Sequence, residues 1–379
     1  MQPASDLEPL SAAVLPTGVR ARVVEGVADL RVHLLEAGDP RDPLVLLVHG
    51  FPELAFSWRR VLPGLAAAGY HAVAPDLRGY GRTTGWGAGY DEPLAPFRPT
   101  ALVRDLEALV RALGRRSADA VVGHDVGSHV AACCALTRPD VFPAVALLSA
   151  PFGGAPPVRV GEARPTGDVH ADLLALPRPR VHYQWYYATR QANDDLLQAP
   201  EGLHAFLRAY FHVKSADWPG NEPHPLAGWT AGELARLPTY YVMDAGETMP
   251  STVAPHLPDA ASVAANRWLP DADLAVYVDE YARTGFQGGL QWYRVRTTGL
   301  WDADLAPFAG RTIDVPALFV GGASDWGVHQ APGALERMRR SACTDLRGVH
   351  LLEGAGHWVQ QERADETTRL LAAFLATVG

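Results

Sequence analysis

Cysteine is scarce in this chain of 379 residues, which has only Cys133, Cys134 and Cys343. Two adjacent cysteines and one remote cysteine provide neither a disulfide framework nor a Cys-x-x-Cys metal site. We therefore predict no cysteine-bound metal, and the chemistry inferred from the remaining residues requires no metal or other cofactor. This use of cysteine fits a reducing compartment, and we expect an intracellular, cytoplasmic protein.

Long apolar runs, long basic runs and internal repeats are also absent. No apolar stretch approaches the roughly 20 residues of a membrane-spanning helix. The opening segment MQPASDLEPL lacks the charged and apolar parts of a signal peptide. The formal net charge is -9, with both signs mixed along the chain, which disfavours nucleic acid as a partner. We expect a soluble protein with no membrane or nucleic-acid partner, and its oligomeric state, a homo-oligomer included, stays open.

Hydrophobic residues make up 48% of the chain, which is enough for a large core. Short apolar runs alternate with amphipathic helical patterns, as in a buried parallel sheet covered by helices. The pattern predicts an α/β fold with a mostly parallel sheet flanked by helices. The predicted strands are 44–49, 71–76, 119–124, 144–149, 315–322 and 346–354. The predicted flanking helices are 58–68, 100–114, 128–136 and 364–376.

A block of different composition interrupts this alternation. From about 153 to 296 the chain is rich in Pro, Trp and Tyr, has helical patterns such as 202–211 and 272–285, and shows no clear buried strand. We therefore predict a core in two parts, 1–153 and 298–379, with an inserted, mostly helical cap (lid) domain at 154–297.

The segment VVGHDVGSHV places Asp125 between a predicted strand and a predicted helix. Gly123 and Gly127 flank it, as small residues flank the nucleophile of a strand-turn-helix elbow. Such a turn also directs the backbone N–H of Val126 toward the nucleophile as half of an oxyanion hole. An ordinary strand-helix turn whose Asp caps the helix would give the same short pattern.

Three further residues at strand ends favour the elbow. HGFPE follows a strand and offers the backbone N–H of Phe51 as the second oxyanion donor. Asp325 follows the strand at 315–322, and His357 lies in the loop after the last strand. The chain order nucleophile, acid, base is therefore Asp125, Asp325, His357. A single residue of this kind is often a helix cap or a solvated loop residue, but three in this order indicate a catalytic triad.

With these segments the chain resembles the epoxide hydrolase branch of the α/β-hydrolase fold. The similar segments are HGFPELAFSWR, DLRGYGRT, GHDVGS, SAPFGG, GASDWG and GAGHWVQQE, which span the core from about residue 30 onward. Members of that branch carry two tyrosines in the lid. The runs HYQWYY and TGFQGGLQWYR are similar to the segments that hold them, and the resemblance implies Tyr183 and Tyr293.

The chemistry of an epoxide explains a carboxylate at the elbow. A carboxylate is ionised at pH 7 without a general base, so Asp125 can attack the carbon and form an alkyl ester. Tyr183 and Tyr293 would donate to the epoxide oxygen as acids. Water activated by His357, oriented by Asp325, would then hydrolyse the ester to a vicinal diol, with epoxide and water as the only partners.

The chain departs from the family pattern in two places. Most relatives have Trp after the nucleophile, whereas this chain has the smaller Val126, which should widen the pocket. The segment 218–250 has no counterpart in the pattern and brings Trp229, Tyr240 and Tyr241 into the lid. We expect Trp185, Tyr186 and Tyr241 to bind a bulky or aromatic substrate, natural products included. Whether Tyr183 or one of these other lid aromatics contacts the epoxide oxygen stays open.

Several alternatives remain at this point. A hydrolytic dehalogenase would use the same Asp nucleophile, and Trp185 resembles a halide-binding position, but Val126 replaces the usual Trp or Arg. A serine esterase is disfavoured because Ser128 lies beyond the elbow. A small-molecule binding protein on this scaffold would often lack a triad member. Biosynthetic and detoxifying roles, the attacked carbon and the stereochemistry are not distinguished.

Overall fold

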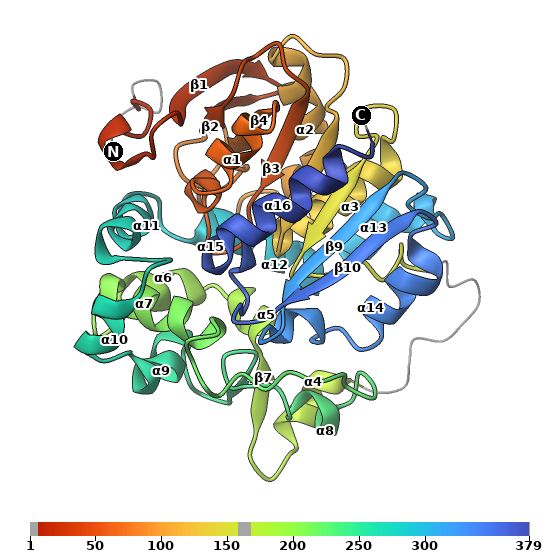
Figure 1. The fold of residues 1–379 in the computed structure, drawn as a ribbon. Helices are drawn as coiled ribbons and strands as arrows, with labels where there is room; N and C mark the ends of the chain where they lie inside the picture. Colours follow the sequence, from red (N-terminus) through yellow and green to blue (C-terminus); the bar gives the residue numbers. More distant parts are fainter. Residues whose placement is uncertain (1–6, 158–167, 379) are drawn as a thin grey trace.

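The computed structural model describes residues 7–157 and 168–378. An eight-stranded sheet forms its centre, in the order β1-β2-β4-β3-β5-β6-β9-β10 (Figure 1). The strands from β4 to β10 run parallel, and β1 and β2 are antiparallel additions at one edge. The α/β fold class with a mostly parallel sheet is thereby confirmed.

All six predicted strands are present, and five of them are continuous runs buried on both faces of the parallel sheet, whereas β10 is a partly solvated edge strand. They are β3 (Leu44–Val48), β4 (His71–Pro75), β5 (Ala120–His124), β6 (Val145–Leu148), β9 (Ala317–Gly322) and β10 (Leu346–Leu352). The edge strands β1 (Arg20–Val27) and β2 (Leu30–Ala37) were not predicted. Strand β1 is largely solvated, so it lacks the continuous apolar run by which the other strands were recognised.

Helices cover both faces of the sheet. In Figure 1, α16 crosses one face with α1 beside it, and α2 and α3 lie behind the strands. The predicted helices correspond to these four, whose bounds are α1 (Leu62–Ala67), α2 (Pro99–Ala112), α3 (Val126–Thr137) and α16 (Ala364–Leu375). Short helices α14 (Ala334–Arg337) and α15 (Val359–Glu362) complete the second part of the core.

The described chain between β6 and β9 is mostly helical, and its elements from α4 to α10 lie below the sheet in Figure 1. It also contains a short antiparallel pair, β7 and β8, which was not predicted because each strand has only three residues. The bounds of the cap itself, 154–297, stay a prediction. The elements are α4 (Val169–Leu174), β7 (Arg180–His182), α5 (Tyr183–Tyr187), α6 (Ala192–Leu197), α7 (Leu203–Lys214), α8 (Ala231–Leu234), β8 (Val242–Asp244), α9 (Met249–Val253), α10 (Ala260–Ala265), α11 (Asp271–Thr284), α12 (Gln287–Thr297) and α13 (Leu300–Leu305).

The helical layer touches the core closely at α12. A Cβ atom added to Gly288 would lie 2.1 Å from the carbonyl oxygen of Gly79, so the two backbones meet without intervening side chains. Helix α12 is thereby held against the core near the carboxyl ends of the parallel strands, where ligands bind in open α/β sheets. Within the described ranges, no helix is both long enough and apolar enough to span a membrane.

Candidate active site

Asp125 occupies the turn between β5 and α3. Its backbone angles, φ 53° and ψ -116°, belong to a region that non-glycine residues rarely adopt. A Cβ atom on Gly123 would lie 2.0 Å from the carbonyl oxygen of Gly127, and one on Gly127 would lie 2.3 Å from that of Val48. Both flanking positions therefore require glycine, and the strained turn presents the Asp125 carboxylate at the end of the strand.

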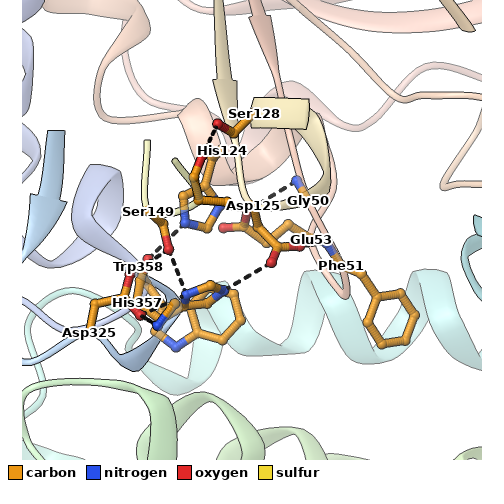
Figure 2. Close-up of polar contacts among 12 residues, drawn as sticks. Gly50, Phe51, Glu53, His124, Asp125, Ser128, Ser149, Asp325, His357 and Trp358 are labelled. Carbon is orange, nitrogen blue, oxygen red and sulfur yellow. Dashed lines mark hydrogen bonds and ion pairs between the residues drawn. The ribbon is translucent and has the colours of Figure 1, made fainter. Parts of the chain in front are cut away.

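A backbone donor holds one oxygen of this carboxylate. The N–H of Phe51, in the loop after β3, donates to Oδ1 of Asp125 over 3.1 Å (Figure 2). Gly50 permits the approach, since a Cβ there would lie 2.5 Å from the Cβ of Asp125. Val126 lines the cavity in front of Asp125. Its N–H belongs to the first turn of α3, where N–H groups have no partner within the helix.

His357 links Asp125 to a second carboxylate. Its Nε2 lies 3.4 Å from Oδ2 of Asp125, and its Nδ1 lies 3.1 Å from Oδ1 of Asp325. Nδ1 is also 2.7 Å from Oγ of Ser149, whose hydroxyl donates to Oδ2 of Asp325 (Figure 2). All four side chains follow the carboxyl ends of parallel strands, which explains why residues so distant in sequence meet here.

The backbone of His357 is fixed from two sides. Its N–H donates to the carbonyl of Lys214 over 2.8 Å, and its carbonyl accepts from Nε2 of His124 over 2.7 Å. His124 also donates from Nδ1 to Oε2 of Glu53 over 2.6 Å. Since both partners of His124 are acceptors, its imidazole carries both protons. Burial opposes ionisation of both side chains, yet their mutual charge raises the pKa of His124 and lowers that of Glu53.

Asp125 is ionised in this setting. Burial alone would raise the pKa of its carboxyl, but the adjacent His357, with the positive charges of Lys214 and His124, holds that pKa well below its usual range. Lys214, at the end of α7, is buried with Nζ facing the rings of Tyr241 and Tyr210, 4.8 and 5.2 Å from their centroids. The site therefore presents an ionised carboxylate without needing a base to deprotonate it.

A cavity of about 80 Å³ separates Asp125 from the helical layer. Tyr183 on α5 and Tyr293 on α12 line it opposite Asp125, with their ring centroids 5.9 Å apart. Tyr183 donates to Oε1 of Gln330 over 3.2 Å and accepts from Nε2 of Gln184 over 3.2 Å. Burial, above all, raises the pKa of both phenols. Both are therefore neutral and can donate hydrogen bonds into the cavity.

Comparison with known proteins assigns the family. The family model described as alpha/beta hydrolase fold matches residues 43–181. Epoxide hydrolase B of Mycobacterium tuberculosis is 35% identical over 91% of this chain and 95% of that protein. This chain belongs to the epoxide hydrolase family. The prediction of a hydrolase acting on ether bonds is thereby confirmed at the level of family.

Solved epoxide hydrolases also share the fold. The epoxide hydrolase from an endophytic Streptomyces is 35% identical and has a TM-score of 0.74, covering 95% of this chain and 96% of that one. Epoxide hydrolase A from Mycobacterium thermoresistibile is 34% identical with a TM-score of 0.71, covering 94% and 98%. The likeness spans the core and the helical layer together.

The structure separates the lid aromatics into two groups. Tyr183 projects toward Asp125, whereas Trp185 and Tyr186, on the same helix α5, line a different cavity of about 490 Å³ with His170 and Met243. Trp185 is two positions after Tyr183 and therefore points to another side of the helix. Tyr186 is three positions after Tyr183, but its hydroxyl donates to Oδ2 of Asp195, which lines the second cavity. Trp185 and Tyr186 therefore do not meet Asp125 in this structure.

The remaining lid aromatics also differ in position. Tyr241 is buried behind Tyr183, with ring centroids 5.3 Å apart, and Tyr240 donates to Oδ1 of Asn221 over 2.5 Å. Neither lines the cavity at Asp125, whereas Trp229 does and is 45% exposed. The insertion thus places one aromatic side chain at the cavity and uses the two tyrosines for packing.

Sequence reasoning missed several polar residues of this epoxide hydrolase site. Glu53, His124 and Ser149 each stood inside a segment that resembled the family, at the end of a predicted strand. Their position near strand ends, inside these segments, was the signal that could have identified them as site residues. Lys214 and Arg296 had no comparable signal, since a single cation on a helical pattern is usually a solvated residue. Among the described residues, no cluster of His, Cys, Asp and Glu could hold a metal ion.

Proposed function

We propose that this protein opens an epoxide by attack of Asp125 and releases a vicinal diol. The observation that carries the proposal is the position of that carboxylate. Its Oδ1 is held by the N–H of Phe51, its Oδ2 lies 3.4 Å from Nε2 of His357, and two neutral phenols face it across one cavity. A nucleophile and acids on opposite sides of a strained ring are what ring opening requires.

The first step forms an ester and breaks one ring C–O bond. A carboxylate oxygen of Asp125 attacks an epoxide carbon, and the ring oxygen takes a proton from Tyr183 or Tyr293 as the C–O bond breaks. Both phenols have a raised pKa, so each is protonated and available as an acid at neutral pH. The product of this step is an alkyl ester on Asp125 with a neighbouring hydroxyl.

The second step hydrolyses that ester. His357 takes a proton from water through Nε2, while Asp325 and Ser149 hold Nδ1. The water oxygen attacks Cγ of Asp125, and the N–H groups of Phe51 and Val126 stabilise the oxyanion. Collapse of this intermediate breaks the bond to the substrate and returns the proton to the leaving alkoxide. The diol leaves, and the remaining proton of the water passes to the tyrosinate left by the first step, so that the carboxylate of Asp125 and the phenol are both regenerated.

The size of the cavity bears on the substrate. A volume of about 80 Å³ is well below the roughly 300–1,000 Å³ of pockets that hold drug-sized ligands. A bulky polycyclic substrate would require the helical layer to move. We therefore propose a small or single-ring aromatic epoxide as the substrate class. The cytoplasmic location and a homo-oligomeric assembly stay predictions.

Dehalogenation is the second candidate that the sequence left open. Its support was Trp185 as a halide-binding residue, and that side chain lines a different cavity from Asp125. A binding protein without activity is disfavoured because the nucleophile, acid and base stand together. Epoxide opening is therefore the function that this geometry supports best.

Trapping the ester tests the proposal. The variant His357→Gln should be alkylated by styrene oxide but should not hydrolyse the ester. Intact-protein mass should then rise by the mass of the whole epoxide, and peptide mapping should place the adduct on Asp125. Asp125→Asn is the matched control and should give no adduct. An adduct on another residue, or one formed only from an alkyl halide with loss of the halogen, would contradict the proposal.

An isotope experiment tests the second step in the unmodified enzyme. With enzyme in excess over styrene oxide in ¹⁸O-labelled water, a single turnover should place the label in Asp125 and leave the diol unlabelled. Direct attack of water on the epoxide would place the label in the diol instead, and this result would exclude the ester intermediate.

A further inference from the structure

Arg296 lines the same cavity as Asp125 and has no ion-pair or hydrogen-bond partner for its guanidinium within 7–157 and 168–378. Two deeply buried arginines, in contrast, are paired. Arg59 lies 2.7 Å from Asp273, and Arg78 lies 2.7 Å from Asp105. Arg294, on the same helix, donates to Oε1 of Gln291 over 2.7 Å and stacks on Tyr90. Arg296 therefore differs from these three arginines in facing the cavity at Asp125 without a partner.

Helix geometry relates Arg296 to the candidate acid. Both Tyr293 and Arg296 belong to α12, three residues apart, and both line the cavity. Side chains at this spacing share one face of a helix and are offset by about 4.5 Å along its axis. A substrate whose epoxide oxygen lies at Tyr293 would therefore extend its next few atoms toward Arg296.

The surroundings of Arg296 keep its charge available. The indole of Trp301 packs on the guanidinium, whose central carbon lies 5.1 Å from the ring centroid. Burial lowers the pKa of His129 and of His182 to about 3, so these neighbouring imidazoles are neutral. Burial also lowers the pKa of Arg296, and the charge of Asp302 opposes this. A guanidinium stays protonated under such shifts, so the cavity contains a fixed positive charge.

We propose that Arg296 binds a carboxylate of the substrate, so that the preferred substrate is an anionic epoxide. This inference rests on the proposed function, because it assigns the epoxide oxygen to the tyrosine one helical turn away. A guanidinium and a carboxylate match in a planar, two-hydrogen-bond geometry, and a substrate carboxylate would supply the missing partner. The carboxylate would lie about one helical turn from the oxirane.

A matched substrate pair tests this assignment. The acid is 4-(oxiran-2-yl)benzoate, and its methyl ester presents the same epoxide without the charge. In the wild-type protein, kcat/KM should be higher for the acid than for the ester. In Arg296→Gln, the ratio of the two kcat/KM values should fall about 10- to 100-fold, the usual loss for a hydrogen-bonded charged pair. The change should appear mainly in KM, because the carboxylate contact is equal in the ground and transition states.

Two further variants show whether the effect is specific. Arg296→Lys keeps the charge and should retain part of the preference for the acid over the ester. Added salt should weaken this preference. Arg294→Gln removes an arginine of the same helix whose partners lie outside the cavity, and it should leave the acid-to-ester ratio unchanged. The inference is wrong if the wild type shows no preference for the acid. It is also wrong if Arg296→Gln reduces kcat/KM equally for the acid and the ester.

Binding without reaction separates this inference from the proposed function. Calorimetry with 4-ethylbenzoate and 4-ethylbenzamide measures the anion preference without an epoxide. One outcome is that no epoxide alkylates Asp125, while the wild type binds the benzoate more tightly than the benzamide and Arg296→Gln does not. This outcome would support the anion site and contradict the proposed reaction. If styrene oxide is opened but the benzoate and benzamide bind equally, only the anion site fails.

Discussion

Oγ of Ser149 lies 2.7 Å from Nδ1 of His357, closer than the 3.1 Å between Nδ1 and Oδ1 of Asp325. The same hydroxyl donates to Oδ2 of Asp325. Since its single proton points to the carboxylate, Oγ accepts from the Nδ1–H of the imidazole. Ser149 does this with a φ of 68°, which is rare outside glycine. It therefore positions the imidazole of His357 and does not itself line the cavity in front of Asp125.

Removal of this hydroxyl should slow ester hydrolysis selectively. In Ser149→Ala, the imidazolium loses an acceptor worth about 1.5 kcal/mol, so hydrolysis should slow about tenfold. Alkylation should keep its rate, because it needs no proton transfer to His357. Rapid-quench mass spectrometry of the Asp125 adduct separates the two rates. Ser128→Ala is the control, since Oγ of Ser128 donates to the carbonyl of Ala150 instead. Equal slowing of both steps in Ser149→Ala would indicate a structural role.

The two cavity tyrosines should control ring opening. Tyr183→Phe and Tyr293→Phe should each slow alkylation of Asp125 by about 10²-fold or more, the usual scale for a lost general acid. Tyr241→Phe should change it little, because that ring packs behind Tyr183 outside the cavity. Single-turnover alkylation rates with styrene oxide measure all three. A large effect only in Tyr241→Phe would move the acid role to that residue.

The acid limb of alkylation should depend on His357. Burial raises the pKa of Asp125, and His357 is the main group that lowers it. In the wild type the carboxyl therefore stays ionised below the ordinary Asp pKa of about 3.9, and alkylation persists as pH falls toward that value. In His357→Gln this lowering is lost, so the fall in rate should begin at higher pH. Adduct formation followed against pH measures the shift. Superimposable acid limbs would mean that other charges set this pKa.

The backbone strain at Asp125 should lower the free energy of unfolding of the protein. Residues forced into such backbone regions cost roughly 1–3 kcal/mol. Asp125→Gly relieves the strain and Asp125→Ala does not, while both remove the carboxylate. We expect the free energy of unfolding to be about 1 kcal/mol higher for the glycine variant, as measured by urea denaturation. Equal stabilities would show that the turn relaxes when the carboxylate is absent.

The parallel strands and the elbow were predictable because local sequence carries them. A continuous apolar run such as 120–124 has no polar face for solvent, so it indicates a strand buried on both faces of a sheet. Gly123 and Gly127 indicate that the strand and the helix pass close to each other. The edge strand at 20–27 was missed because its solvated residues resemble those of a loop. The strands at 180–182 and 242–244 exist through their pairing with each other, which no local pattern reveals.

Sequence by itself determined the identity and order of Asp125, Asp325 and His357 and the strand ends that carry them, because those signals are short-range. Only the tertiary structure decided which aromatic and charged side chains share the cavity. Tyr183 and Trp185 stand two residues apart, yet they line different cavities because helix α5 turns them to different sides. The position of Arg296 was likewise decided by the tertiary structure. The fold places its guanidinium in the cavity at Asp125 and brings no carboxylate of the described residues close enough to pair with it.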